Sequence, residues 1–118
     1  MKAITAHQIN ELNEQITIVA DDRDAGNGNA SHNYDVHFAD RKIAIPFQHG
    51  VVKAVGVNGV TNEALLAIVI DRLQGFQEGA FSCRENAVAL THLETALMWL
   101  QKRTRDRVVR GVEGTHQK

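Results

Sequence analysis

The stretch that decides the fold is "NGVTNEALLAIVIDRLQGFQEGAFSCRENAVALTHLETALMWLQKRTRDRVVR", residues 58–110. Its apolar residues recur every three or four positions, which is the spacing of a helix with one buried face. Thr61 can cap a first helix, and the glycine-containing segment 75–79 can end it. Ser82 and Glu85 are spaced as a capping box for a second, longer helix. Because few residues separate the two helices, we expect them to form an antiparallel hairpin.

The second helix carries a leucine seam of the kind found where two helices pack along one line. We expect Met98 and Trp99, which lie beside this seam, to be packing residues. The first helix has a wider apolar stripe, as expected for a helix that covers a protein core. The seam consists of Leu90, Leu93, Leu97 and Leu100, and the stripe of Leu65, Leu66, Val69, Ile70 and Leu73.

The first 57 residues predict one short helix followed by strands. From Thr5 as cap, apolar residues at Ile9, Leu12 and Ile16 indicate a short amphipathic helix. β-branched and aromatic residues then predict two strands around a Gly- and Asn-rich loop. A further hairpin is expected around His49-Gly50, and Pro46 suggests that its first strand lies at an edge or a bulge. The segments read as strands are "ITIVADD" (16–22), "HNYDVHF" (32–38), "KIAIPFQ" (42–48) and "VVKAVGV" (51–57).

The sequence therefore predicts an α+β fold. We expect a short N-terminal helix, a small antiparallel β-sheet and a C-terminal antiparallel two-helix hairpin whose last helix is long. At 118 residues the chain is predicted to be a single domain, with the helix and strands in residues 1–57 and the hairpin with a short tail in 58–118.

Composition excludes several classes of function. A net charge of −1 argues against wholesale binding to nucleic acid. The longest apolar run, Ala64–Ile70, is too short to span a bilayer, and the polar N-terminus lacks the apolar core of a signal peptide. Cys83 is the only cysteine, which suits a reducing cytoplasm, and we expect it to be a buried thiol.

No metal site and no cofactor are predicted. The six histidines include no pair spaced to share one face of a predicted helix. His32 and His37 would point to opposite faces of one strand, so we expect them to be surface residues rather than ligands of one metal.

A basic cluster stands out near the end of the long helix. Five of the thirteen Lys and Arg residues fall between Lys102 and Arg110, and Asp106 alone opposes them. Two interpretations remain open. The cations can be solvated and favoured by the helix dipole, or several guanidinium groups can surround a bound phosphate or pyrophosphate. The second interpretation rests on one line along the helix through Ala89, Leu93, Ala96, Leu100, Arg103, Arg107 and Arg110, which would place three arginines on an inward-facing stripe.

Helix length separates the basic cluster from the hairpin tip. Asn86 and Arg103 would be roughly 25 Å apart along one helix. A twofold dimer with these helices antiparallel would bring the tip of one subunit to the arginines of the other. There, Phe76 or Phe81 could stack on a base, Asn86 could hydrogen-bond, and the arginines could hold phosphates.

The motifs "CREN" (83–86), "ALMWL" (96–100), "RTRDR" (103–107) and "RGVEGT" (110–115) resemble those of a known family. Residues 58–115 resemble the helical hairpin of the phage Thoeris anti-defence sponge family, which is similar in its hairpin to an anti-CBASS cyclic-nucleotide sponge family. The resemblance implies a protein that is not an enzyme and that sequesters glycocyclic ADP-ribose in the cytoplasm of the infected bacterial host. Cyclic di- or trinucleotides, taken up at separate sites, are further implied ligands.

The resemblance also implies partners and site residues. It implies a homo-oligomer, as a dimer that assembles into a hexamer by joining three dimers. No membrane or nucleic acid partner is expected. The family's signal-binding positions fall on Phe76, Asn86, Arg103 and Arg107, and helix geometry adds Arg110. Relatives are expected to have proline at the position of Ala80, and alanine in its place would loosen the hairpin turn.

Two other classes of function are considered. A small phage nucleic-acid-binding or structural accessory protein would use the basic cluster on a polyanion. A cyclic-nucleotide-cleaving enzyme would need a paired acid and base, and Asp106 and Glu113 are the carboxylate side chains nearby in sequence. Gly111 is expected to end the long helix, and the tail after it would fold back over the site.

Overall fold

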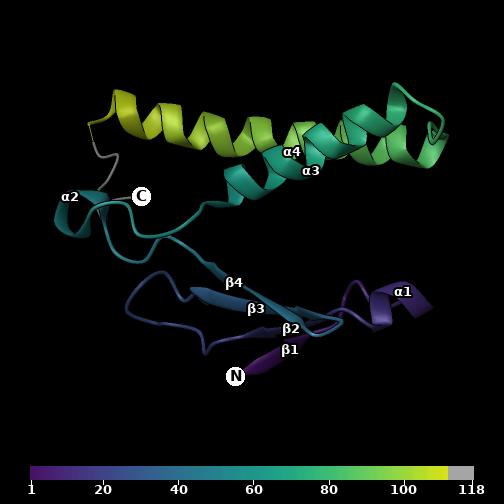
Figure 1. The fold of residues 1–118 in the computed structure, drawn as a ribbon. Coiled ribbons are helices and arrows are strands. Elements are labelled where there is room, and N and C mark those ends of the chain that lie inside the picture. Colours follow the sequence, from purple (N-terminus) through teal and green to yellow (C-terminus); the bar gives the residue numbers. More distant parts are fainter. Residues whose placement is uncertain (112–118) are drawn as a thin grey trace. The chain divides into compact units, whose positions relative to one another are not determined.

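The computed structural model describes residues 1–111, and these form two compact units that divide between Val60 and Thr61. The first unit is built on a β-sheet and the second on two helices, as Figure 1 shows for each. The predicted α+β class is confirmed. The prediction that both units form one domain stays a prediction.

The first unit contains one antiparallel sheet of four strands in the order β1-β2-β3-β4. Adjacent strands pair in sequence order, so every connection is a simple reversal. Ala20, at the end of β2, is fully buried and marks the core of this unit. The strands are β1 (Lys2–Ile4), β2 (Thr17–Ala20), β3 (Asn33–Phe38) and β4 (Arg41–Pro46).

The beginning of the chain differs from the prediction. Strand β1 was not predicted, and the helix α1 (Glu11–Glu14) is only one turn long. Its cap is Asn10 rather than Thr5, because the Asn10 side chain accepts the hydrogen bond of the Asn13 N–H at 3.1 Å. The predicted apolar face is not buried, since Ile9 is 87% exposed.

The predicted hairpin around His49-Gly50 is wrong. Strand β4 pairs with β3 instead, across a two-residue connection formed by Ala39 and Asp40. The segment after β4 forms the single-turn helix α2 (Val52–Val55). The edge position inferred from Pro46 is confirmed, because β4 is an outer strand and Pro46 ends it.

The segment leading out of α2 returns to the end of β4. Val60 forms an isolated parallel bridge with Phe47, and its N–H donates to the carbonyl of Pro46 at 2.9 Å. Gly59 passes so close to the backbone of Phe47 and Gln48 that a Cβ atom there would lie 2.7 Å from the Gln48 nitrogen. Only glycine fits this close approach without displacing backbone.

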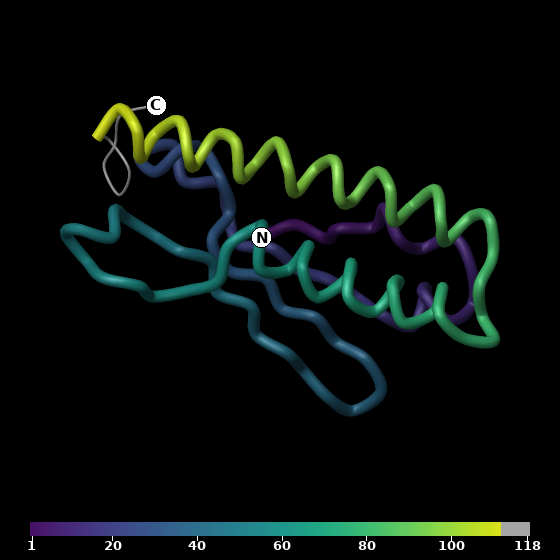
Figure 2. Tube along the Cα trace, turned by 90° about the horizontal axis from the view of Figure 1, so that it is seen from above, coloured from purple at the N-terminus to yellow at the C-terminus, as the bar shows by residue number. Residues whose placement is uncertain are grey.

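The second unit is the predicted antiparallel hairpin of α3 (Asn62–Gln77) and α4 (Arg84–Val109). Figures 1 and 2 both show the two helices lying side by side. The predicted cap of α3 is confirmed, because the Thr61 hydroxyl accepts from the Ala64 N–H at 3.1 Å. Gly111 follows the end of α4 with a positive φ of 72°, as predicted for a left-handed helix end.

The start of α4 lies one residue later than predicted. Cys83, not Ser82, is the cap, and its Sγ accepts from the Asn86 N–H at 3.4 Å. This role leaves the thiol exposed, so the prediction of a buried cysteine is wrong.

The inner face of α4 confirms the leucine seam and corrects the arginine line. Within α4, every side chain that is not exposed lies at spacings of four and three along one stripe. Arg107 belongs to this stripe and is 5% exposed, whereas Arg103 and Arg110 are exposed. Met98 and Trp99 are also exposed, so their predicted packing role is wrong. The stripe is Asn86, Leu90, Leu93, Leu97, Leu100, Thr104 and Arg107.

Among the described residues, no helix combines the length and the apolar character needed to cross a lipid bilayer.

Candidate functional site

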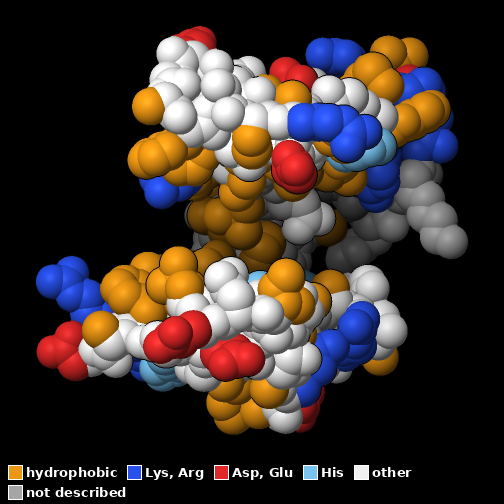
Figure 3. Space-filling model, turned by 90° about the vertical axis from the view of Figure 1, so that its right-hand side faces the viewer, with side chains coloured by type: hydrophobic (Ala, Val, Ile, Leu, Met, Phe, Trp, Pro, Cys, Tyr) orange, Lys and Arg blue, Asp and Glu red, His pale blue; other side chains and the backbone are white. Residues whose placement is uncertain are grey.

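The last turns of α4 form a basic hollow of about 320 Å³. The helix rises about 1.5 Å per residue and turns every 3.6 residues, so side chains three and four positions apart meet on one side. In the helical unit, Lys and Arg side chains gather on one side of the face shown in Figure 3, with hydrophobic side chains among them. The described residues that line the basic hollow are Trp99, Lys102, Arg103, Asp106, Arg107 and Arg110.

Charge in the basic hollow is strongly unbalanced. Four of its lining side chains are cations, and Asp106 is the one carboxylate among them. Asp106 accepts a hydrogen bond from Lys102 Nζ at 2.7 Å, within the helix at i and i+4. Within residues 1–111, no ion pair neutralises Arg103 or Arg110. Exposed guanidinium groups without a carboxylate partner suit a phosphate or pyrophosphate, whose oxygens match the paired N–H donors of each guanidinium.

Trp99 lines the basic hollow, whereas the sequence predicts a packing residue at this position. The side chain is 60% exposed and lines the basic hollow. Its position four residues before Arg103 was a usable signal, because residues at i and i+4 share one helix face. An exposed indole beside guanidinium groups offers a flat surface on which a nucleobase can stack.

The hairpin tip holds the other predicted site residues. The rings of Phe76 and Phe81 meet edge to face, with centroids 5.9 Å apart and planes at 85°. Phe81 is 72% exposed. The Arg72 guanidinium carbon lies over the Phe76 ring, 4.9 Å from its centroid, which is a cation–π contact.

Hydrogen bonds fix the turn that carries these aromatic rings. The Asn86 Nδ2 donates to the carbonyl of Phe81 at 3.3 Å, and the Gln77 Oε1 accepts from the Cys83 N–H at 3.1 Å. Within residues 1–111, no side chain or backbone group donates a hydrogen bond to the amide oxygen of Asn86. The tip is thus a built surface with two aromatic rings and an amide.

One chain does not bring the tip and the basic hollow together. Asn86 lies near the start of α4 and Arg103 near its end, roughly 25 Å apart at a rise of about 1.5 Å per residue. Phe76 and Asn86 therefore form one half of the predicted site, and Arg103, Arg107 and Arg110 form the other. The tail expected to fold over the arginines lies outside the described residues, as does Glu113.

A different set of polar side chains gathers in the sheet unit. Asp24, His32 and His49 place one carboxylate oxygen and two ring nitrogens within 4.8 Å of one another. His32 was predicted to be a surface residue, but it is only 8% exposed. Sequence reasoning missed this group because its members come from three separate segments that only the folded sheet unit joins.

The chain matches a family model described as the Acb2/Tad1 hairpin domain over residues 39–105. This chain belongs to that family. The family predicted from the motifs of the long hairpin is thereby confirmed. The matched part of the Acb2/Tad1 hairpin domain contains Phe76, Asn86, Trp99 and Arg103, and it ends before Arg107.

A curated relative of this Acb2/Tad1 chain is named Thoeris anti-defense 1 and comes from Bacillus phage SBSphiJ7. The two proteins are 59% identical over 81 residues, which cover 69% of this chain. The same residues cover 57% of the relative, so the match spans little more than half of that protein's length.

Proposed function

We propose that this protein is a phage anti-defence protein that binds and sequesters a cyclic nucleotide immune signal without cleaving it. Glycocyclic ADP-ribose of the Thoeris system is the first ligand to test, and cyclic di- and trinucleotides follow. The protein would act in the cytoplasm of the infected host. Membership of the Acb2/Tad1 family and the name of the phage relative support the anti-defence role. The basic hollow with its exposed indole supports an anionic nucleotide as the ligand.

The observation that carries this proposal is the pair of exposed guanidinium groups at Arg103 and Arg110, with no ion pair within residues 1–111. These two like charges lie about two turns apart on one side of α4 and repel each other, and a bound diphosphate relieves that repulsion. Trp99 offers its face to a base, and the buried Arg107 completes the lining. This arrangement recognises a compact ligand that carries both phosphates and an aromatic base.

A homodimer would complete the site. In a twofold dimer with antiparallel α4 helices, Phe76 and Asn86 of the partner subunit face the basic hollow. The tip then supplies an aromatic surface and an amide to the base, while the arginines hold the diphosphate. Three such dimers would form the expected hexamer.

The chemistry of the lining supports sequestration rather than cleavage. Asp106 is the carboxylate in the basic hollow, and its charge is engaged by Lys102. General base catalysis needs a base that is available to take a proton from the nucleophile. Chromatography of the ligand after incubation should recover it intact. A cleaved ligand would instead establish the enzymatic alternative.

Calorimetry with glycocyclic ADP-ribose tests the proposal directly. Arg103→Ala removes a charge-assisted hydrogen bond worth about 1.5–3 kcal/mol, which corresponds to roughly 10- to 150-fold weaker binding. Arg105→Ala is the matched control, because Arg105 is exposed and does not line the basic hollow. Equal losses in the two variants would show that only general charge matters. Uptake of duplex DNA with a steep salt dependence, in place of the small ligand, would favour the nucleic-acid-binding alternative.

Mixed oligomers test whether two subunits share one site. Asn86→Ala and Arg103→Ala subunits should each bind poorly alone. In a mixed dimer, one of the two sites combines the intact Asn86 of one subunit with the intact Arg103 of the other. Equal mixing makes about half of the dimers mixed, so about a quarter of all sites should return. If no sites return although exchange is complete, the shared site is wrong.

A further inference from the structure

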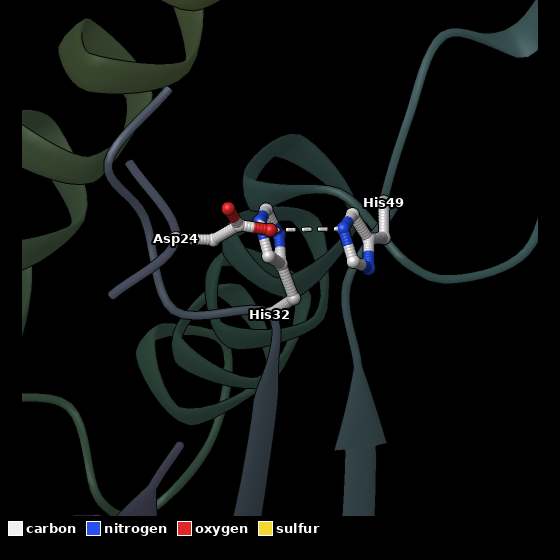
Figure 4. Close-up of side chains that lie close together, drawn as sticks. All are labelled: Asp24, His32 and His49. Atoms are coloured by element: carbon white, nitrogen blue, oxygen red, sulfur yellow. Dashed lines mark hydrogen bonds and ion pairs between the residues drawn. The ribbon is translucent and has the colours of Figure 1, made fainter. Parts of the chain in front are cut away.

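The cluster Asp24–His32–His49 in the sheet unit has the chemistry of a metal site. The His49 Nε2 lies 3.1 Å from the Asp24 Oδ2, and the His32 Nε2 lies 3.8 Å from the same oxygen. Figure 4 shows the Asp24 carboxylate pointing toward both rings. Two imidazoles and one carboxylate are a donor set that binds divalent transition metals, Zn²⁺ in particular.

The environment of the His32 ring is not explained by an ion pair with Asp24 alone. The His32 side chain is buried, and its Nε2 has no hydrogen-bond partner among the described residues. The nearest carboxylate oxygen, at 3.8 Å, is too distant for a hydrogen bond. Leaving a buried polar atom unpaired costs free energy, so such an atom in a folded protein calls for an explanation. A metal ion would satisfy it through the nitrogen lone pair.

The surrounding structure orients the carboxylate as metal sites require. Asn27 Nδ2 donates to the Asp24 Oδ2 at 2.9 Å, and the Gly26 N–H donates to the Oδ1 at 3.1 Å. These two donors hold the side chain in place, as residues around a metal ligand commonly do.

The rings of His32 and His49 cannot both bind one metal ion in their present orientation, so one of them must move. They are stacked, with centroids 4.2 Å apart and planes at 6°. A metal lies in the plane of each imidazole that binds it, and two parallel planes share no such point. The His49 side chain is 48% exposed, so its ring can tilt out of the stack with buried His32 while its Nε2 stays beside Asp24.

We propose that Asp24, His32 and His49 form a site for a divalent transition-metal ion, Zn²⁺ foremost, in which water fills the remaining coordination position. The ion ties the turn that begins at Asp24 to the segment that follows β4. This site lies in the sheet unit and uses no residue of the proposed nucleotide site.

The test is calorimetry of Zn²⁺ with the full chain, free of any histidine tag, in a buffer that does not chelate. The expected result is one Zn²⁺ per chain. His49→Ala and Asp24→Asn should weaken binding at least as much as the loss of a residue that orients a metal ligand, roughly 10- to 100-fold or more. His37→Ala is the matched control, because His37 lies in β3 outside the cluster and should leave Zn²⁺ binding unchanged.

Co²⁺ provides a second readout that does not depend on affinity alone. Co²⁺ held by two imidazoles and a carboxylate should give intense visible absorption, and the ring NMR signals of His32 and His49 should shift while those of His37 stay. Circular dichroism confirms that each variant remains folded. Absence of Zn²⁺ uptake by the folded wild-type chain, or uptake unchanged in folded His49→Ala, would overturn the proposal. Neither outcome depends on nucleotide binding, so the two proposals fail independently.

Discussion

Replacing Cys83 by serine should stabilise the helical unit, because a sulfur atom caps α4. The Cys83 Sγ accepts from the Asn86 N–H at 3.4 Å, which is a long contact from a weak acceptor. A serine hydroxyl accepts the same N–H at about 2.9–3.0 Å. Serine is among the preferred residues at this position, whereas cysteine is not. The rest of the tip, including the Gln77 contact to the backbone N–H of residue 83, is unaffected.

The magnitude follows from the known value of helix caps. A good cap contributes about 1 kcal/mol relative to alanine, and the weak sulfur contact should supply only part of this. Cys83→Ser should therefore raise the free energy of unfolding by about 0.5–1 kcal/mol. For a unit of this size, 1 kcal/mol corresponds to a Tm shift of about 4–8 °C, so the expected rise is about 2–8 °C.

Chemical denaturation, followed by the far-UV circular dichroism of the helices, measures this change in the free energy of unfolding. Ser82→Ala is the matched control and should have almost no effect, because Ser82 does not cap the helix. The opposite pattern would refute the reasoning. If Ser82→Ala costs about 1 kcal/mol while Cys83→Ser changes nothing, then α4 starts one residue earlier, as the capping box predicts.

Two further predictions concern the sheet unit. Gly59→Ala should destabilise the sheet unit by about 1–3 kcal/mol, because the new methyl group meets the Phe47 backbone. Denaturation curves measure this loss, and an unchanged curve would show that the backbones of residues 59 and 47 can move apart at no cost. A hydrogen bond from the Asn33 side chain is the main cause that lowers the pKa of Asp21 below 3.8. The stability this provides is present above pH about 3.8 and is lost as the pH falls through the lower folded-state pKa. Unfolding measured from pH 5 to pH 2, a range of about three units, should show this loss in wild type and less of it in Asp21→Asn, and equal slopes would contradict the assignment.

Local sequence pattern was enough for the helical hairpin, although it placed the start of α4 one residue too early. The leucine seam and the Thr61 cap predict α3 and α4 because each depends on neighbours within one or two turns. The arginine line failed because two lines along α4 share Leu93, Leu100 and Arg107. Only packing decides which line faces inward, and in the structure it is the one that also contains the other two seam leucines.

The sheet unit was harder to predict because its elements are short. Strand β1 has three residues, and the helices α1 and α2 have four each, so none spans enough sequence to show a period. The pairing of β4 with β3 depends on the two residues Ala39 and Asp40. The cluster of Asp24 and two histidines depends on tertiary contacts between separate segments, which no local pattern records.

The two outer strands bear on how copies of this chain can associate. An unpaired strand edge can pair with a strand of another molecule, and repeated pairing of this kind builds an open-ended aggregate. Here one edge, β1, offers only three residues, and the other, β4, starts with Arg41 and Lys42 and stops at Pro46. Short length, positive charge and proline all discourage strand addition. Both edges of this sheet therefore discourage strand addition, so association between copies of this chain would have to use surfaces other than the strand edges.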